Sequence, residues 1–296
     1  MDSFSEITQL FLKKRIAIFS TTLLFFIIAI FYSLSLKDIY ESDGVYLIRN
    51  DSGQDQSNIG SLSILAGISG QSGNNKSKII RNTLYSRDFF KYFYNDNALL
   101  AIITDIDEYQ KITKDVRYNN FNILSNEWAL IDGKTSKPSF EDAQTIFENA
   151  LSYENIDGPE IIKIKFNSRS PYAAKKILEV IVSKINEDTR NFEKNDTNKS
   201  IKFFKDMLSN QNEVYLNDAY AALLEQRVKS LELIEIYEDF SLKTIESPSV
   251  PEKKIKPKRT LVVVFFSAFG FILSLLLIAS NEFLINLRKR GLKNSI

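Results

Sequence analysis

Residues 245–280 read IESPSVPEKKIKPKRTLVVVFFSAFGFILSLLLIAS, and this stretch decides how the chain is organised. Three of the six prolines, Pro248, Pro251 and Pro257, lie here within ten residues, interleaved with a basic run. Twenty-two residues without a charge follow, at positions 260–281. A helix of that length measures about 33 Å, enough to cross a bilayer core. Because proline fixes φ and removes a donor, the stretch predicts an extended, stiff lead-in to a membrane-spanning helix.

A second uncharged run, IAIFSTTLLFFIIAIFYSLSL, occupies residues 16–36. It is longer than the apolar core of a signal peptide and ends in bulky residues, so it predicts a retained transmembrane helix. Lys13, Lys14 and Arg15 precede it, and only Lys37 follows closely. This charge bias places the N-terminus in the cytoplasm. Residues 1–15 are expected to form a short amphipathic helix.

Two spans place both ends of the chain on one side of the membrane. The predicted organisation is therefore a cytoplasmic tail at 1–15, a span at 16–36, a periplasmic α+β domain at 37–259, a span at 260–281 and a cytoplasmic tail at 282–296. The second span has basic residues on both sides, at 253–259 and 288–293. The charge rule loses force for long translocated segments, and the first helix usually dominates.

Composition excludes several kinds of chemistry. The chain has no Cys and no His, so it holds no disulfide, thiol nucleophile, histidine metal ligand or Ser-His-Asp triad. Its net charge of +1 offers no field to attract nucleic acid. A glycine-rich stretch between Gly53 and Gly73 lacks the order of a phosphate loop. The acidic pairs Asp105/Asp107 and Glu141/Asp142 are interpreted as exposed surface groups. We therefore expect no catalytic, cofactor-binding or metal-binding residues.

Between the spans the pattern predicts a mixed domain. Tyr40, Val45 and Leu47 mark a strand within 38–50, and EIIKIKFN alternates as a strand at 160–167. Residues 77–113 are expected to be helical, and 117–133 to form a loop in which the single tryptophan, Trp128, is a packing residue. Ser139 is expected to cap a helix over 139–153.

A long helix is predicted from Pro171 to Asn210, with Ser170 as its cap and proline at its first position. Its first half has an apolar face, and its second half is polar yet poor in helix breakers. A polar helix of about 60 Å gains stability only by packing, so we expect it to pack on neighbouring copies. A break at 209–217, a second helix at 215–235 and a last strand at 240–245 lead to the proline run.

The spacing Pro248-x2-Pro251-x4-Lys256-Pro257-Lys258-x11-Gly270-x3-Ser274 closely resembles the proline-rich motif of the polysaccharide co-polymerases, the chain length determinant proteins of bacterial surface polysaccharides. The family pattern reads Pro-x2-Pro-x4-Ser-Pro-Lys-x11-Gly-x3-Gly. Lys256 departs from its serine and Ser274 from its second glycine. Ser274 keeps a small residue four positions from Gly270, so close helix approach is retained. The segment LAGISG at 65–70, which is like one found in the family, and the string SRDF at 86–89 add to the resemblance.

The resemblance implies a small sheet near the membrane, built from both ends of the domain, and a long helix reaching away from it. It implies a non-enzymatic inner-membrane co-polymerase without cofactors. Such a protein assembles as a homo-oligomer and sets the chain length distribution of a lipid-linked, O-antigen-like polysaccharide. The expected partners are a separate polymerase and the lipid bilayer, with direct binding of the glycan left open. The assembly and partner motif is expected at Pro248, Pro251, Pro257, Lys258, Gly270 and Ser274.

Two alternatives remain open from the sequence. A two-span scaffold for capsule or exopolysaccharide export would act with a separate kinase or an outer-membrane pore and have no role in length control. The basic run at 253–259 is either solvated beside lipid headgroups or specific for an anionic glycan or a partner.

The predicted topology can be tested with a reporter that is active only in the periplasm. Because three cations precede the first span, a fusion after Gly133 should be active and a fusion after Ile296 should be inactive. The reverse pattern would contradict the topology.

Overall fold

The computed structural model describes residues 14–49, 73–210 and 214–293, and divides the chain into two units. One unit comprises the residues up to Ile39 together with those from Lys254 onward, and the other is Tyr40–Lys253. The predicted amphipathic helix, apart from its last two residues, and most of the glycine-rich stretch lie outside the described residues. The domain boundaries from sequence, 37 and 259, differ slightly from this division. Asp38, Ile39 and residues 254–259 belong with the hydrophobic helices.

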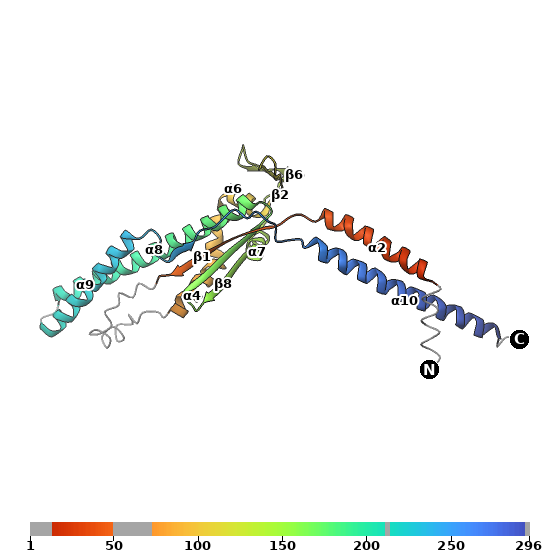
Figure 1. Ribbon diagram of the computed structural model, residues 1–296. Coiled ribbons are helices and arrows are strands. Elements are labelled where there is room, and N and C mark those ends of the chain that lie inside the picture. The colour runs from red at the N-terminus through yellow and green to blue at the C-terminus, as the bar shows by residue number, and fades with distance from the viewer. Residues whose placement is uncertain (1–13, 50–72, 211–213, 294–296) are drawn as a thin grey trace. The chain divides into compact units, whose positions relative to one another are not determined.

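The first unit is a pair of hydrophobic helices, α2 (Arg15–Ser35) and α10 (Arg259–Lys293). They lie side by side along much of their length (Figure 1). Two segments pass the length and composition test for a membrane span, Arg15–Ser35 with a mean hydropathy of 2.3 and Arg259–Asn281 with 2.9. Both predicted spans are confirmed as helices. The second helix continues past Asn281 into residues expected to form a tail.

The second unit is built on a four-stranded antiparallel sheet in the order β10-β1-β9-β8. Its strands are β1 (Tyr40–Ile48), β8 (Leu151–Asp157), β9 (Ile161–Ser168) and β10 (Leu242–Glu246). Alternate residues of β1 and β9 are buried, as expected of strands with one covered face. Because β1 pairs with β10, the first and last strands of the domain are neighbours, as the resemblance implied.

Aromatic side chains fill the core beneath this sheet. Phe147 of α7 (Phe140–Ala150) lies 5.3 Å from Phe90 and 5.2 Å from Phe93, ring centre to ring centre. Both partners come from α5 (Arg87–Asn95), which Ser86 caps by accepting a hydrogen bond from the amide of Phe89. Phe166 of β9 completes the stack, 5.9 Å from Phe147. The SRDF string therefore starts the helix that carries the core.

The long helix is present as predicted. Helix α8 (Pro171–Asn210) begins after Ser170, whose Oγ accepts from the amide of Ala173. The apolar face of its first half packs on β1 and β9 and is buried, at Ala174, Ile177, Leu178, Ile181 and Ile185.

The packing of the polar half differs from expectation. Helix α9 (Val214–Ile236) folds back along it, so the first partner of the polar half is a segment of the same chain (Figure 1). An ion pair between Lys194 and Glu235 and a ring contact of 6.3 Å between Phe204 and Tyr220 join the two helices.

The helical prediction for 77–113 is wrong beyond Thr104. The segment forms α4 (Gly73–Leu84), α5, α6 (Asn97–Thr104) and then the strand β2 (Ile106–Tyr109). The predicted loop holds further short strands, β3 (Val116–Tyr118), β4 (Phe121–Asn122), β5 (Glu127–Trp128), β6 (Leu130–Ile131) and β7 (Lys134–Thr135). The helix capped by Ser139 ends at Ala150, and the next three residues begin β8.

Asp105 corrects the interpretation of the acidic pairs. It is only 5% exposed, and its carboxylate accepts from the amides of Asn120 and Phe121 at 2.7 and 2.8 Å. Asp107 accepts from the guanidinium of Arg117 at 2.6 Å. Both acids therefore organise the start of the hairpin region instead of facing solvent without a role.

Asn186 of α8 attaches the last strand to the helix. Its side chain is 4% exposed, and its Oδ1 accepts from the amides of Ser241 and Leu242 at 3.0 and 2.7 Å. Its Nδ2 donates to the carbonyl of Leu242 at 3.1 Å. Because these backbone groups are buried, they have little access to water as a substitute partner.

We expect Asn186→Ala to destabilise the domain by about 3 kcal/mol, because it leaves two buried amides and a carbonyl unpaired. Thermal unfolding of the full chain in detergent should then occur roughly 6–12 °C lower. The matched control is Glu187→Ala, which removes only an exposed contact with Lys184 and should cost no more than about 1 kcal/mol. Equal melting temperatures for the two variants would contradict this role.

Candidate functional site

Gly270 and Ser274 lie on the face of α10 that packs against α2. Gly270, Ser274 and Ile278 are all buried, at intervals of four residues. A Cβ added at Gly270 would lie 2.5 Å from Cβ and 2.7 Å from Cγ of Phe25. Both separations are far shorter than a van der Waals contact, so only glycine fits at this crossing.

Aromatic pairs extend the contact along the two helices. Phe25 lies 6.1 Å from Phe269, and Tyr32 lies 5.4 Å from Phe266, between ring centroids. The pairing is antiparallel, because residue numbers rise on α2 as they fall on α10. Small residues at 270 and 274 allow another helix to approach closely. In the structure that helix is α2 of the same chain. In lipid such close packing, rather than burial from water, holds helices together.

The segments that leave the two helices are also paired. Ile39 donates from its amide to the carbonyl of Lys256 at 3.0 Å and accepts from the amide of Ile255 at 2.8 Å. This is an antiparallel bridge between a residue just after α2 and a residue just before α10. The exits of the helices are therefore hydrogen-bonded to each other.

Asp38 adds a charged contact to the same place. Its Oδ1 accepts from Nζ of Lys254 at 2.7 Å and from Nη2 of Arg259 at 3.1 Å. The three side chains are between 25% and 37% exposed, so water screens the interaction only in part. We call Asp38, Lys254 and Arg259 the exit clamp.

The exit clamp divides the basic run into two sets. Lys254 and Arg259 are half-buried against Asp38, whereas Lys253, Lys256 and Lys258 are exposed. Lys258 of the predicted motif acts here through its backbone, since its carbonyl accepts from the amides of Leu261 and Val262 at the start of α10. Pro257 precedes it and is half-buried. The exposed set leaves three cations free to meet headgroups or a partner.

Pro248 and Pro251 belong to the other unit and are half-buried. Between them, the carbonyl of Ser249 accepts from Oγ of Ser42 at 2.8 Å, and Ser42 is itself buried in β1. The structure therefore separates the predicted motif into two groups. One lies with the hydrophobic helices, and the other lies along the first strand of the sheet.

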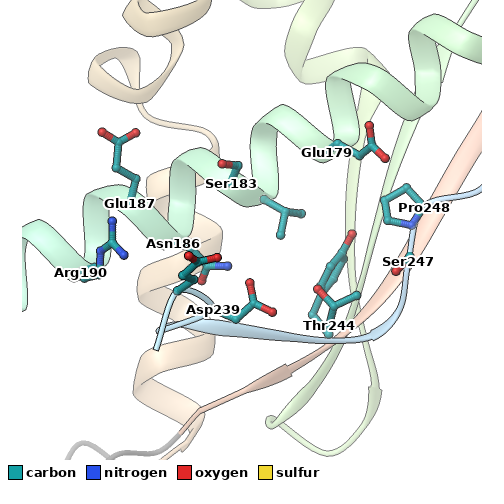
Figure 2. A pocket seen from close by; sticks show the side chains of 12 residues that line it. Glu179, Ser183, Asn186, Glu187, Arg190, Asp239, Thr244, Ser247 and Pro248 are labelled. Carbon is teal, nitrogen blue, oxygen red and sulfur yellow. The ribbon is translucent and has the colours of Figure 1, made fainter. Parts of the chain in front are cut away.

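Pro248 also borders a polar cavity of about 580 Å³ (Figure 2). Figure 2 shows that Glu179, Ser183, Asn186, Glu187 and Arg190 of α8 line one side of it. The other side is formed by the end of the α9 connection, β1, β10 and the residues that follow β10, namely Tyr46, Glu238, Asp239, Thr244, Ser247 and Pro248.

The cavity carries more acid than base, four carboxylates against one guanidinium. The hydroxyl of Tyr46 on its wall is buried and has no hydrogen-bond partner within the described residues. Burial, with smaller contributions from Glu179 and Asp43, raises the pKa of Tyr46 well above its ordinary value. Tyr46 is therefore neutral at physiological pH. The four carboxylates give the cavity its hydrogen-bond acceptors and its negative charge.

Nothing in the described part of the chain forms a group of three His, Cys, Asp or Glu able to hold a metal ion. The helix pair is coupled mechanically, because its exits are hydrogen-bonded to each other and α10 packs closely on α2. A displacement of one helix is then passed to the exit of the other. Within the first unit, the small residues Gly270 and Ser274 therefore couple α10 to α2.

Residues 3–96 match the family model described as "Wzz: Chain length determinant protein". The match takes in α2, β1, α4 and α5, and therefore the first hydrophobic helix and the first strand of the sheet. The resemblance to the chain length determinant family is confirmed. The match indicates a polysaccharide chain length regulator of the Wzz type. The proline motif lies outside the matched residues, and its assignment rests on its spacing.

Solved structures of polysaccharide co-polymerases are also similar to this chain. One is a "full-length bacterial polysaccharide co-polymerase", with 12% identity, 94% of this chain and 97% of that chain covered, and a TM-score of 0.40. Another is a fragment of WzzB, a polysaccharide co-polymerase from Salmonella Typhimurium, with 12% identity, 74% and 100% covered, and a TM-score of 0.30. No curated protein matches the sequence.

Sequence reasoning missed two residues of this site. Asp38 is the first acid after the first span, and its position opposite a basic run was a usable signal for the exit clamp. Phe25 carried no comparable signal, because it is one of many large apolar residues in a uniform span. The contact with Gly270 needs the register between the two helices, which spacing within one helix does not supply.

The register can be tested by cross-linking, since the chain has no native cysteine. Phe25→Cys combined with Gly270→Cys should form a disulfide within one chain under mild oxidation in membranes, because the backbones approach closely there. The product should run at the monomer mass of 34.0 kDa. Phe19→Cys with Gly270→Cys is the control, since Phe19 is 69% exposed. A product of twice the mass from the first pair would assign the contact to neighbouring subunits.

Proposed function

We propose that this protein is an inner-membrane co-polymerase that sets the chain length distribution of a lipid-linked, O-antigen-like surface polysaccharide. It acts on a separate polymerase and is not itself an enzyme. The match of residues 3–96 to the chain length determinant family is the observation that carries the proposal. The two hydrophobic helices support an integral membrane protein, and the absence of Cys and His from the sequence supports a non-enzymatic role.

The proposed topology has both termini in the cytoplasm and residues 37–259 in the periplasm. The cations before the first span support it. The antiparallel pairing of α2 and α10 is consistent with it, because two antiparallel spans begin and end on the same side. In this arrangement the exit clamp lies at the periplasmic boundary, where partial exposure of its charges is tolerated.

The outward faces of the helix pair support a partner in the membrane. Large apolar side chains remain exposed on both helices after they pack on each other, among them Phe19, Phe31, Phe265, Phe269 and Leu276. Lipid covers such faces in part, and a polymerase with several spans can cover the rest. Gly270 then acts indirectly, by fixing how the two outward faces are presented together.

Aromatic side chains of α8 that α9 leaves exposed support a homo-oligomer. Phe192 and Phe203 are 71% and 51% exposed on the polar half of α8 even with α9 in place. Large aromatic groups at this density on a helix are typical of an interface. Protein purified in mild detergent should therefore have a mass several times 34.0 kDa.

Deleting the gene separates length control from export. The surface polysaccharide should persist on a gel but lose its modal banding if the protein sets length. Total loss of surface polymer would instead favour a scaffold for capsule or exopolysaccharide export and overturn the proposal.

Gly270→Leu should alter the length distribution at normal protein abundance. The leucine would overlap Phe25 and force α10 away from α2, while the helix stays hydrophobic enough to insert. Pro257→Ala should act more weakly in the same direction, because it loosens the segment that leads into α10. Modal length is read from the polysaccharide gel, and abundance from an immunoblot of membranes.

The matched control is Ala268→Leu, two residues away on an exposed part of the same helix. It adds a similar volume without entering the helix contact, so it should leave α10 packed on α2 and change the banding less than Gly270→Leu does. If Gly270→Leu and Pro257→Ala gave wild-type banding at wild-type abundance, the motif would be only an anchor.

A further inference from the structure

The hairpin of β2 and β3 ends in a turn with an unusual exposed residue. Ile112 at this turn is 97% exposed. It stands between two exposed lysines, in the sequence Lys111-Ile112-Thr113-Lys114. Lys114 adopts a left-handed conformation, with φ of 59°, which reverses the chain and closes the turn. The turn therefore presents one apolar side chain between two cations.

The turn lies near Tyr40, at the end of the domain where the chain enters it from α2. Tyr109, the last residue of β2 before the turn, contacts Tyr40 with ring centroids 6.0 Å apart. Tyr40 is the first residue of β1 and therefore of the whole unit. Tyr109 also contacts Tyr172 in the first turn of α8 at 6.1 Å, and Lys114 lies 6.0 Å from the same Tyr172 ring. It is thus the turn end of the hairpin, not its base, that packs beside Tyr40.

Chain connectivity ties this end of the domain to the membrane. Tyr40 follows Ser35, the last residue of α2, by only five positions. Five residues span at most about 18 Å even when fully extended. Whatever the angle between the two units, Tyr40 and the tyrosines around it therefore remain near the bilayer surface that α2 leaves.

The chemistry of the turn fits that surface. An apolar side chain flanked by lysines can place its methyl groups at the acyl boundary while the ammonium groups reach the phosphates. Basic residues near an anionic surface are attracted to it electrostatically. Tyrosines are enriched at the same depth, because their rings are apolar and their hydroxyls are polar. The other charged group of the turn, Asp115, leaves the segment from Lys111 to Asp115 with a net charge of +1.

A neighbouring turn shows which feature decides the assignment. Ile123 and Leu124 are 63% and 95% exposed between β4 and β5, but the residues on either side of this apolar pair, Asn122 and Ser125, are polar and uncharged. This turn approaches Asn97 at the start of α6, where Asn97 donates to the carbonyl of Asn126 at 3.4 Å. Exposure alone therefore does not indicate lipid. The assignment to the lipid surface rests on the two lysines together with the contact between Tyr109 and Tyr40.

We propose that the β2–β3 turn, Lys111 to Lys114, is a membrane-surface contact in which Ile112 enters the interface and the lysines bind anionic phospholipid headgroups. It provides a third attachment of the domain to the bilayer, besides the two spans. The inference rests on the helices spanning a membrane, as in the proposed function, but not on control of polysaccharide length. The contact would limit rocking of the domain on its two connecting segments.

Depth-dependent quenching tests this contact in the full chain. Ile112→Cys provides a single labelling site, because the sequence has no cysteine. The labelled protein is placed in nanodiscs of phosphatidylcholine and phosphatidylglycerol that carry nitroxide quenchers at the headgroup or the upper acyl chain. We expect several-fold stronger quenching at Ile112 than at the control Phe192→Cys. Phe192 is also apolar and exposed, and it lies roughly 30 Å further along α8 from Pro171.

A charge variant tests the lysines. Adding Lys111→Glu and Lys114→Glu to the Ile112→Cys chain should reduce lipid quenching to the level of the control. Removing phosphatidylglycerol should weaken quenching in the original chain and have little effect in this variant. Lipid quenching at Ile112 equal to that at Phe192 would overturn the proposal. Protection of the label from an aqueous quencher without quenching by lipid would also overturn it and would assign the turn to a protein partner or a second copy.

Discussion

The first unit of this protein depends on the pairing of the two exits of its hydrophobic helices. Asp38 accepts from Lys254 and Arg259, and Ile39 exchanges backbone hydrogen bonds with residues 255 and 256. Two helices joined by a folded insert could otherwise separate, because lipid gives them no hydrophobic reason to associate. The exit pairing holds one end of the helix pair together. The Gly270 contact with Phe25 then needs only local packing to form, and the insert begins and ends at one point.

The first and last strands of the inserted domain are also paired with each other within the sheet. β1 and β10 are first and last in the domain and lie side by side, and Asn186 fixes β10 to α8 through three buried hydrogen bonds. Long-range pairing of this kind carries a loop-closure cost that grows only slowly with length. Bringing the two ends together beforehand, as the exit clamp does, lowers that cost further. The two units thus support each other through the covalent chain.

Elements with a strong local pattern were predictable from the sequence. The limits of α8 at Pro171 and Asn210 follow from a serine cap, a proline at the first position and a run without breakers. The failure over 105–113 has a physical cause, since the buried carboxylate of Asp105 turns the chain by binding the amides of Asn120 and Phe121. Those hydrogen bonds join residues fifteen and sixteen positions apart and leave no periodic signal. The partner of Gly270 escaped prediction similarly, because spacing shows that a close face exists but not what meets it.

Helix α8 is anchored unequally along its length. Ile177, Leu178 and Ile181 in its first half are completely buried against the sheet, whereas α9 packs along its second half. Opening free energy follows buried apolar contact, so a single continuous helix contains a stable root and a distal part that can open locally. The α8–α9 hairpin can therefore fray or re-pack at its far end without unfolding the sheet. The domain therefore combines a firmly packed base with a pair of helices that reaches beyond the sheet.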